Sequence, residues 1–103
     1  TVVVFGGLDD AYGHSAYEVL DLDEVGMGQQ VLKAGGWQHV WGIGRHVLGS
    51  QIFDYWRDPD GVEMEHYADG DVFDAAQPTA YHDFDPGLLW NWGDDLPADF
   101  GPR

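Results

Sequence analysis

A tight turn at residues 58–61, with the sequence Asp-Pro-Asp-Gly, does more than any other feature to limit what this chain can fold into. Pro59 fixes φ at the second position of the turn, and Gly61 tolerates the positive φ at its end. Residues 50–57 before the turn are rich in β-branched and aromatic side chains, and residues 62–67 after it alternate between two sets of side chains. Both patterns are typical of strands. The sequence therefore predicts a hairpin.

A strand, a helix and a further strand are predicted before this hairpin. Residues 14–20 have the composition of a strand, and residues 37–41 form a short aromatic strand candidate. Asp21, followed three residues later by Glu24, forms a capping box that starts a helix, and the Gly pair at 35–36 ends it. The predicted order of elements is β-α-β-β-β.

The chain divides into three parts, although its 103 residues suffice for only one small domain. Residues 1–13 form a lead-in strand and turn, and residues 14–67 form the β-α-β-β-β module. Residues 68–103 are rich in Asp but contain interleaved aromatic residues, two Trp among them. A solvated acidic tail is one interpretation. Since disordered tails seldom carry Trp, we expect instead an irregular extension packed on the module.

The charge of the chain excludes several classes of function. It carries 19 Asp and Glu against 4 Lys and Arg, a formal net charge of −15. Such a surface repels phosphate backbones and anionic lipid, so we expect neither a nucleic-acid partner nor a membrane partner. The absence of Cys excludes a disulfide framework, a thiolate zinc site and a Cys nucleophile. It is also compatible with a reducing compartment, and we predict a cytoplasmic location.

Five His residues raise the question of a metal site. A His on a strand is more often a structural residue than a ligand. Two imidazoles and one carboxylate on one face, however, can hold iron and leave three coordination positions open for a diol and dioxygen. The sequence contains no phosphate-binding Gly-rich loop, nucleophile elbow or H-E-x-x-H motif that would indicate other chemistry.

An ordered motif runs from residue 44 to residue 65. It reads Gly44-Arg-His46, then Tyr55-Trp-Arg-Asp58-Pro59-Asp-Gly61, then Glu65. This motif resembles the signature of the type I extradiol ring-cleavage dioxygenases of the vicinal oxygen chelate superfamily, which also contains glyoxalase I and bleomycin-resistance proteins. Asp54 departs from the signature, which has an apolar residue at that position. The resemblance implies an α+β fold: a curved mixed sheet with one helix on its outer face and an irregular C-terminal extension.

The resemblance also implies roles for four residues. His14 matches a metal-binding His, and Glu65 matches the carboxylate ligand of the metal. His46 matches a His that lies over the substrate and handles protons, and Tyr55 matches the Tyr that bonds a substrate hydroxyl. The implied metal is Fe(II), with Mn(II) as the alternative. These roles are chemically reasonable, because an imidazole exchanges protons near neutral pH and a phenol donates a hydrogen bond without ionising.

Each assignment has a structural alternative that needs no chemistry. His14 could cap its strand, and His46 could bond a backbone carbonyl from a loop. Tyr55 could be half-buried packing in the sheet. Glu65 could be a surface carboxylate paired with a nearby arginine.

The family uses a second metal-binding His, which comes from a preceding module. His39, His66 and His82 are the remaining candidates in this chain. His66 is adjacent to Glu65 and so points to the opposite face of its strand. We therefore expect the third ligand to lie outside this chain, in a preceding module or a second copy. A single open module also leaves sheet edges and an apolar face uncovered, which favours such pairing.

The predicted function is that of the C-terminal part of an extradiol dioxygenase, which cleaves a catechol-type ring with Fe(II) and O2 in aromatic catabolism. The isolated chain, lacking one ligand, would bind iron weakly and could be inactive. Two alternatives remain: a small-molecule binding module of the bleomycin-resistance type, and a glyoxalase-type metal-dependent isomerase or lyase. The pairing of His46 with Tyr55 argues against the glyoxalase reaction, which relies on a metal-bound carboxylate as base.

Overall fold

The computed structural model describes residues 2–5, 11–83 and 85–101. That part of the chain contains five strands and two helices. The strands are β1 (Val2–Phe5), β2 (Ala11–Glu18), β3 (His39–Arg45), β4 (Ile52–Arg57) and β5 (Glu63–Ala68). The helices are α1 (Leu22–Ala34) and the short 3-10 helix η1 (Pro86–Leu88). The turn expected at the end of the lead-in segment, at residues 6–10, lies outside the described residues.

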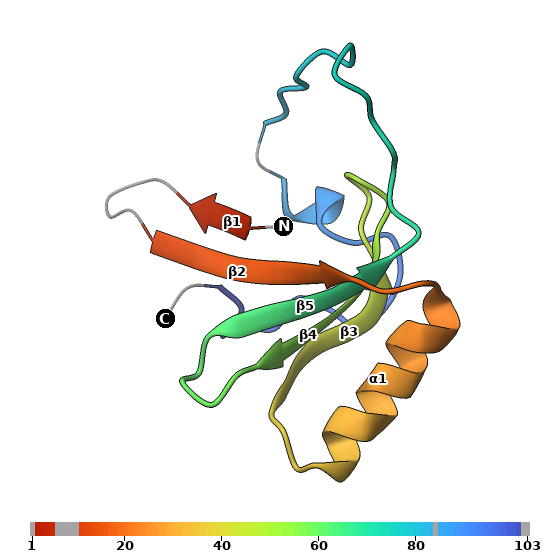
Figure 1. The fold of residues 1–103 in the computed structure, drawn as a ribbon. Coiled ribbons are helices and arrows are strands. Elements are labelled where there is room, and N and C mark those ends of the chain that lie inside the picture. The colour runs from red at the N-terminus through yellow and green to blue at the C-terminus, as the bar shows by residue number, and fades with distance from the viewer. Residues whose placement is uncertain (1, 6–10, 84, 102–103) are drawn as a thin grey trace.

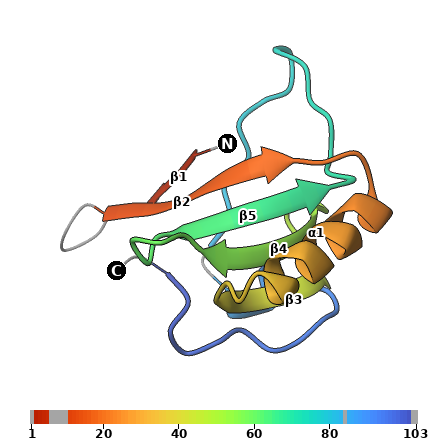
Figure 2. The same ribbon diagram turned by 60° about the horizontal axis from the view of Figure 1, so that its bottom comes forward.

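The five strands form one sheet in the order β1-β2-β5-β4-β3. Strands β2 and β5 run parallel, and the other neighbouring pairs are antiparallel. Helix α1 connects β2 to β3 and packs on β3, β4 and β5, along one face of a twisted and curved sheet (Figures 1 and 2). The predicted α+β class, with a β-α-β-β-β order and a mixed sheet, is confirmed.

The predicted capping groups start and end helix α1. The Glu24 N–H donates to Asp21 Oδ1 at 3.0 Å, and the Glu24 carboxylate accepts from the Leu20 N–H at 2.6 Å. The helix ends at Gly35, whose N–H donates to the Val31 carbonyl at 3.0 Å. These contacts satisfy terminal backbone groups that a helix otherwise leaves without partners.

The predicted hairpin joins β4 to β5. Asp58 Oδ1 accepts a hydrogen bond of 2.9 Å from the Val62 N–H, and Gly61 adopts a φ of 82°. This left-handed conformation favours glycine. The turn sets the register of the two strands so that Tyr55 lies directly opposite Glu65.

Strands β2 and β3 are longer than the sequence predicted. Strand β2 begins at Ala11 rather than at residue 14, because its first residues pair with β1. Strand β3 begins at His39 and continues to Arg45 instead of ending at residue 41. The bounds of β4 and β5 lie within two residues of the predicted ones.

Close packing explains why β3 continues through two glycines. A Cβ added at Gly42 would lie 2.7 Å from Asp54 Oδ1, and one added at Gly44 would lie 2.6 Å from Phe53 Cζ. Neither position has room for a side chain. The glycines that indicated the end of a strand therefore allow β3 to approach β4 closely.

Each face of the sheet carries a core among the described residues. On the α1 face, a small apolar core consists of Val25, Ile52 and Ala68. The opposite face carries an aromatic core of Trp41, Phe53 and Tyr55. This second core, away from α1, lies next to the candidate functional site.

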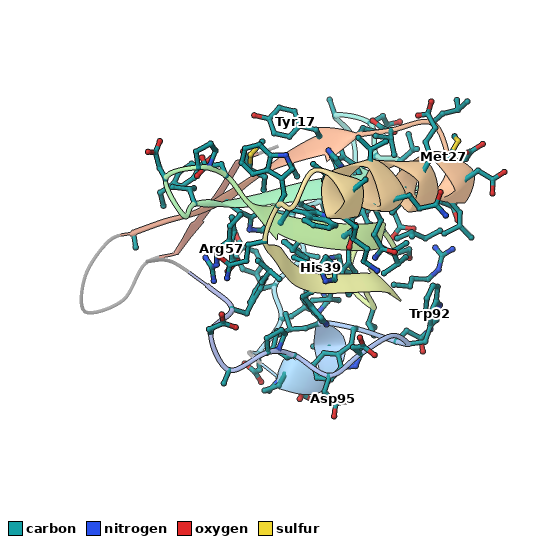
Figure 3. The ribbon with its side chains drawn as sticks, turned by 90° about the horizontal axis from the view of Figure 1, so that it is seen from below. Tyr17, Met27, His39, Arg57, Trp92 and Asp95 are labelled. Carbon is teal, nitrogen blue, oxygen red and sulfur yellow. The ribbon has the colours of Figure 1, made fainter. Side chains whose placement is uncertain are left out.

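The extension after β5 has two parts. Residues 71–83 form an exposed arm that rises away from the sheet, and Val72 is 95 % exposed (Figure 1). Residues 88–101 lie against the module, where the apolar side chains on the aromatic core are Leu89, Trp90, Leu96 and Phe100. Trp92 forms an isolated backbone bridge with Arg45, the last residue of β3, and so pairs the end of this edge strand. Figure 3 shows Trp92 and Asp95 on this segment.

Candidate metal and substrate site

Strand register brings the four candidate residues together on the face of the sheet opposite α1. Tyr55 of β4 is the direct partner of Glu65 on β5. Glu65 in turn pairs with Ala16 of β2, two residues after His14. Residues two apart on a strand share a face, so His14, Tyr55 and Glu65 point to the same side. His46 reaches the group from the segment that follows β3.

Glu65 lies at the centre of the group. Its Oε1 is 3.8 Å from His14 Nε2, and its Oε2 is 3.1 Å from His46 Nε2. The same His46 nitrogen is 3.0 Å from the Tyr55 hydroxyl oxygen. All four side chains are largely buried. Residues that are far apart in the sequence therefore converge on one carboxylate.

The C-terminal extension fixes the ring of His46. Nδ1 of this residue donates its proton to the Leu89 carbonyl, and the ring stacks on Phe53 with centroids 4.2 Å apart. Because Nδ1 holds that proton, Nε2 of the neutral ring presents a lone pair to the Tyr55 hydroxyl. When Nε2 gains a proton, it can donate to Glu65. Nε2 is therefore the His46 ring atom that faces Tyr55 and Glu65.

The charge states of Glu65 and Tyr55 are set by their surroundings. Burial alone would raise the pKa of Glu65, but the polar groups of His14, His46 and Tyr55 around the carboxylate outweigh burial and lower the pKa to about 2. Glu65 is therefore an ionised carboxylate at neutral pH. Burial raises the pKa of Tyr55, and the charge of Glu65 raises it further. The phenol keeps its proton and acts as a hydrogen-bond donor.

The four side chains line a cavity of about 240 Å³. Its other lining residues are uncharged, and they are Leu48, Gln51, Leu88 and Leu89. The cavity thus combines a cluster of four ionisable side chains with a mainly apolar remainder of its wall. That combination suits a small, largely apolar molecule with polar atoms along one edge.

The remaining histidines lie outside this group. His66 faces α1, as its position next to Glu65 predicts, and lines a separate cavity of about 270 Å³. His39 Nε2 lies 2.7 Å from Asp54 Oδ1, and His82 is exposed on the arm. Among the described residues, no three His, Asp or Glu side chains are clustered so that they could hold a metal ion.

His14 and Glu65 nevertheless have the chemistry of two metal ligands. One offers an imidazole nitrogen and the other a carboxylate oxygen, and both are buried and open onto the cavity. Their separation of 3.8 Å is longer than a hydrogen bond, and it is within the span of two atoms bound at roughly 2.1 Å to one ion. Nitrogen and oxygen donors of this kind suit iron and manganese.

The surface-pair interpretation of Glu65 is wrong, because the arginines of the sheet have other partners. Arg57 Nη2 lies 3.4 Å from Glu63 Oε1, and Arg45 Nη2 lies 3.0 Å from Asp69 Oδ2. Glu65 itself is 5 % exposed. Its carboxylate is therefore surrounded by two imidazoles and a phenol instead of an arginine.

Asp54, which departs from the sequence signature, is fully buried. It accepts a hydrogen bond of 2.6 Å from Trp56 Nε1 and lies beside His39. Because adjacent strand residues point to opposite faces, Asp54 faces α1 while Tyr55 faces the cavity. The departure therefore leaves the candidate site unchanged.

Comparison with known proteins gives an independent view of the chain. No family model matches it. It is 42 % identical to Metapyrocatechase 2 of Cupriavidus necator over 88 residues, which make up 84 % of this chain and 28 % of that protein.

Three solved structures share the fold. The Mn(II)-bound glyoxalase from Novosphingobium aromaticivorans has a TM-score of 0.73 and 27 % identity, over 90 % of this chain and 33 % of that one. Catechol 2,3-dioxygenase has a TM-score of 0.65 and 20 % identity, over 91 % of this chain and 30 % of the other. Homoprotocatechuate 2,3-dioxygenase from Brevibacterium fuscum, in complex with 3,4-dihydroxyphenylacetate, has a TM-score of 0.66 and 21 % identity, over 90 % and 30 % of the two chains.

The chain has the fold of a vicinal oxygen chelate module. Its sequence is similar to that of an extradiol dioxygenase, so the resemblance found at residues 44–65 is confirmed. The module spans 28 % of the length of its curated relative and at most 33 % of the three structures. None of the helices in the described ranges is both long and apolar enough to cross a membrane.

Proposed function

We propose that this module is the C-terminal catalytic part of an extradiol dioxygenase, which opens a catechol-type ring with a divalent metal and O2. One observation carries the proposal above all: a His–Tyr pair and a buried His–carboxylate pair line the same small cavity. The similarity to Metapyrocatechase 2 over most of the chain supports it.

In this proposal His14 and Glu65 are two of the metal ligands. The metal is Fe(II), with Mn(II) as the alternative, and the third protein ligand comes from a preceding module or a second copy. When bound, the metal supplies a Lewis-acid and redox centre for a diol and dioxygen. Glu65 compensates part of the metal charge, which its ionised state permits.

The other residues of the cavity orient the substrate and manage its protons. Nε2 of His46 accepts a proton from a diol hydroxyl, while its Nδ1 stays bonded to Leu89. The Tyr55 hydroxyl donates to a substrate oxygen, because its proton is retained at neutral pH. Leu48 and Leu88 give the aromatic ring an apolar wall and exclude water.

Oxygen uptake by the complete protein that carries this module tests the proposal. The protein is loaded with Fe(II) without oxygen and then mixed with several catechols in aerated buffer. We expect consumption of oxygen together with a yellow ring-fission product. Catechol-dependent uptake that survives removal of the metal, or no uptake with any catechol, would contradict the proposal.

The glyoxalase-type reaction is the second candidate, and the TM-score of 0.73 to a Mn(II)-bound glyoxalase favours it. Isomerase or lyase activity of the Mn(II) protein that consumes no oxygen would support this candidate. The His46–Tyr55 hydrogen bond of 3.0 Å favours the dioxygenase instead, because it provides a proton acceptor beside a proton donor. Tight ligand binding that is insensitive to a chelator would indicate a non-catalytic binding module.

The source of the third ligand can be tested separately. We expect the isolated chain to bind Fe(II) weakly, and the complete protein to bind it at least tenfold more tightly. Equal affinities would place all of the ligands within this chain. Sedimentation of the isolated chain with and without the metal reports whether a second copy supplies the missing group.

A further inference from the structure

A buried ion pair lies next to the candidate site, on the same face of the sheet. Arg57 and Glu63 are direct partners in the β4–β5 ladder, one same-face step from Tyr55 and Glu65. Their side chains are 2 % and 1 % exposed, and Arg57 Nη2 lies 3.4 Å from Glu63 Oε1. The dioxygenase proposal gives these two residues no role.

The ion pair holds the end of the C-terminal extension at two points. Arg57 Nη2 donates to the Asp99 carbonyl at 2.9 Å, and the Gly101 N–H donates to Glu63 Oε1 at 2.8 Å. The other Arg57 terminal nitrogen, Nη1, donates to the Gly61 carbonyl at 3.0 Å. Figure 3 shows Arg57 beside the backbone of this segment. Two buried charges therefore fix the backbone on both sides of one residue.

That residue, Phe100, packs on the site. Its ring meets Tyr55 edge to face, with centroids 4.9 Å apart at 82°, and meets Trp41 at 5.2 Å and 70°. Trp41 in turn stacks on Tyr55 at 5.5 Å and 13°, and His14 meets Tyr55 from another side at 5.0 Å. The Tyr55 ring is thus enclosed by aromatic neighbours, and Phe100 is the neighbour that the extension supplies.

We propose that Arg57 and Glu63 are positioning residues, which hold Phe100 against Tyr55 and so keep the Tyr55 hydroxyl aligned with His46 and Glu65. The claim that Arg57 and Glu63 position Phe100 and Tyr55 depends only on these contacts. The claim that this positioning affects catalysis rests on the proposed function. A buried ion pair is weak evidence for added stability, because apolar side chains can often replace it. Here the ion pair instead fixes the position of a distant backbone segment, since Glu63 binds Gly101, 38 residues further along the chain.

The shape of the guanidinium makes the proposal testable. A lysine at position 57 keeps the charge but presents one ammonium group in place of a planar fork. It cannot reach Gly61, Glu63 and Asp99 in the same way. We therefore expect Arg57→Lys to loosen residues 99–101 while leaving the buried charge of Glu63 compensated.

The experiment uses the complete protein with ring-labelled tyrosine. NMR reports the environment of Tyr55, and Tyr55→Phe assigns its resonance. We expect Phe100→Ala and Arg57→Lys to shift the Tyr55 resonance, and Phe100→Tyr to leave it near its wild-type position. Phe73→Ala is the matched control, because Phe73 lies in the same extension and is 63 % exposed. Loss of the Phe100 ring current shifts the Tyr55 resonance in Phe100→Ala by itself, so Arg57→Lys, which keeps that ring, is the deciding variant. An unshifted Tyr55 resonance in folded Arg57→Lys protein would overturn the proposal.

Kinetics on catechol then test the catalytic effect. We expect Phe100→Ala and Arg57→Lys each to lower kcat by about tenfold with a smaller change in KM, since misplacing a catalytic group by even 1 Å can cost on the order of a hundredfold. If Arg57 acts through Phe100, the double variant is no worse than the poorer single variant. Additive effects would overturn the coupling. Should the wild-type protein turn over no catechol, the dioxygenase proposal fails, and the NMR result alone decides the positioning role.

If Arg57→Lys does not fold, Glu63→Gln takes its place, because it keeps the Phe100 ring and removes the charge that accepts from the Gly101 N–H. A shifted Tyr55 resonance in folded Glu63→Gln protein supports positioning through the ion pair. An unshifted resonance would contradict it.

Discussion

Tyr55 and Glu65 face each other across the β4–β5 ladder, and both lie within reach of one nitrogen of His46. The phenol has a single proton, and the His46 nitrogen and the Glu65 carboxylate can each accept it. In the proposed function, a substrate hydroxyl in the cavity would join this set of donors and acceptors. The arrangement therefore allows a proton to move without any large change in the positions of heavy atoms.

The pH dependence of stability tests the state of Glu65. In metal-free protein, the lowered pKa of this buried carboxylate contributes about 3 kcal/mol to the free energy of unfolding above pH 4.5, its ordinary pKa. As the pH falls below 4.5 the unfolded state binds the proton first, so this contribution shrinks, and it is gone below a pH of about 2. Urea denaturation should therefore give a gap between wild type and Glu65→Gln that closes over this range. Glu18→Gln, at an exposed position, is the control, and a gap that does not change with pH would contradict the prediction.

Tyr55→Phe removes one hydroxyl from the cavity and keeps the ring. If the hydroxyl donates to the substrate, kcat for a catechol should fall by about a hundredfold. The ring contacts with Trp41 and Phe100 remain, so the thermal midpoint should change little. Tyr17→Phe, at a position that is 52 % exposed, is the matched control. An unchanged kcat in the Tyr55 variant would remove this residue from the proposed mechanism.

His14→Ala tests the metal assignment directly. We expect Fe(II) affinity of the complete protein to fall more than tenfold, because a nitrogen ligand is lost. His82→Ala, which alters an exposed histidine on the arm, should leave the affinity unchanged. Equal losses in the two variants would show that the effect is general and not due to a ligand. Equilibrium dialysis with metal analysis makes the measurement independent of turnover.

Val25→Ala tests the core between α1 and the sheet. Val25 is fully buried, so removing two methyl carbons should cost about 2 kcal/mol of unfolding free energy. Val31→Ala, in the same helix at a position that is 70 % exposed, should change it by less than about 0.5 kcal/mol. Chemical denaturation of both variants gives the comparison. Similar losses at the two positions would contradict the prediction, because Ala favours a helix more than Val does and helix propensity alone would raise the stability of both variants.

Features specified by neighbouring residues could be predicted from the sequence. The capping box at Asp21 and Glu24 and the turn at residues 58–61 involve residues at most a few positions apart. Once the hairpin turn is predicted, the length of the turn sets the strand register that places Tyr55 opposite Glu65. The element order and the opposite faces of Glu65 and His66 therefore follow from local sequence patterns alone.

Features that depend on distant segments could not be predicted in this way. Nothing in the sequence around Glu63 indicates that its carboxylate is buried. It is buried because residues 99–101 cover it and Arg57 pairs with it. The apolar wall of the cavity comes partly from Leu88 and Leu89, whose sequence shows no periodicity. The continuation of β3 through Gly44 depends on the nearness of Phe53. In each case the tertiary contact outweighs the local pattern.

The burial of Asp54 restricts how this module can change over time. Its carboxylate accepts a hydrogen bond from the Trp56 indole and lies beside His39. Because Asp54 is fully buried, solvent cannot replace the carboxylate as the acceptor. Replacing Asp54 with an apolar residue leaves the Trp56 indole N–H without an acceptor unless residue 56 changes as well. In related sequences, the residues at these positions should therefore vary as a set, with an apolar residue at 54 accompanied by a side chain at 56 that requires no acceptor.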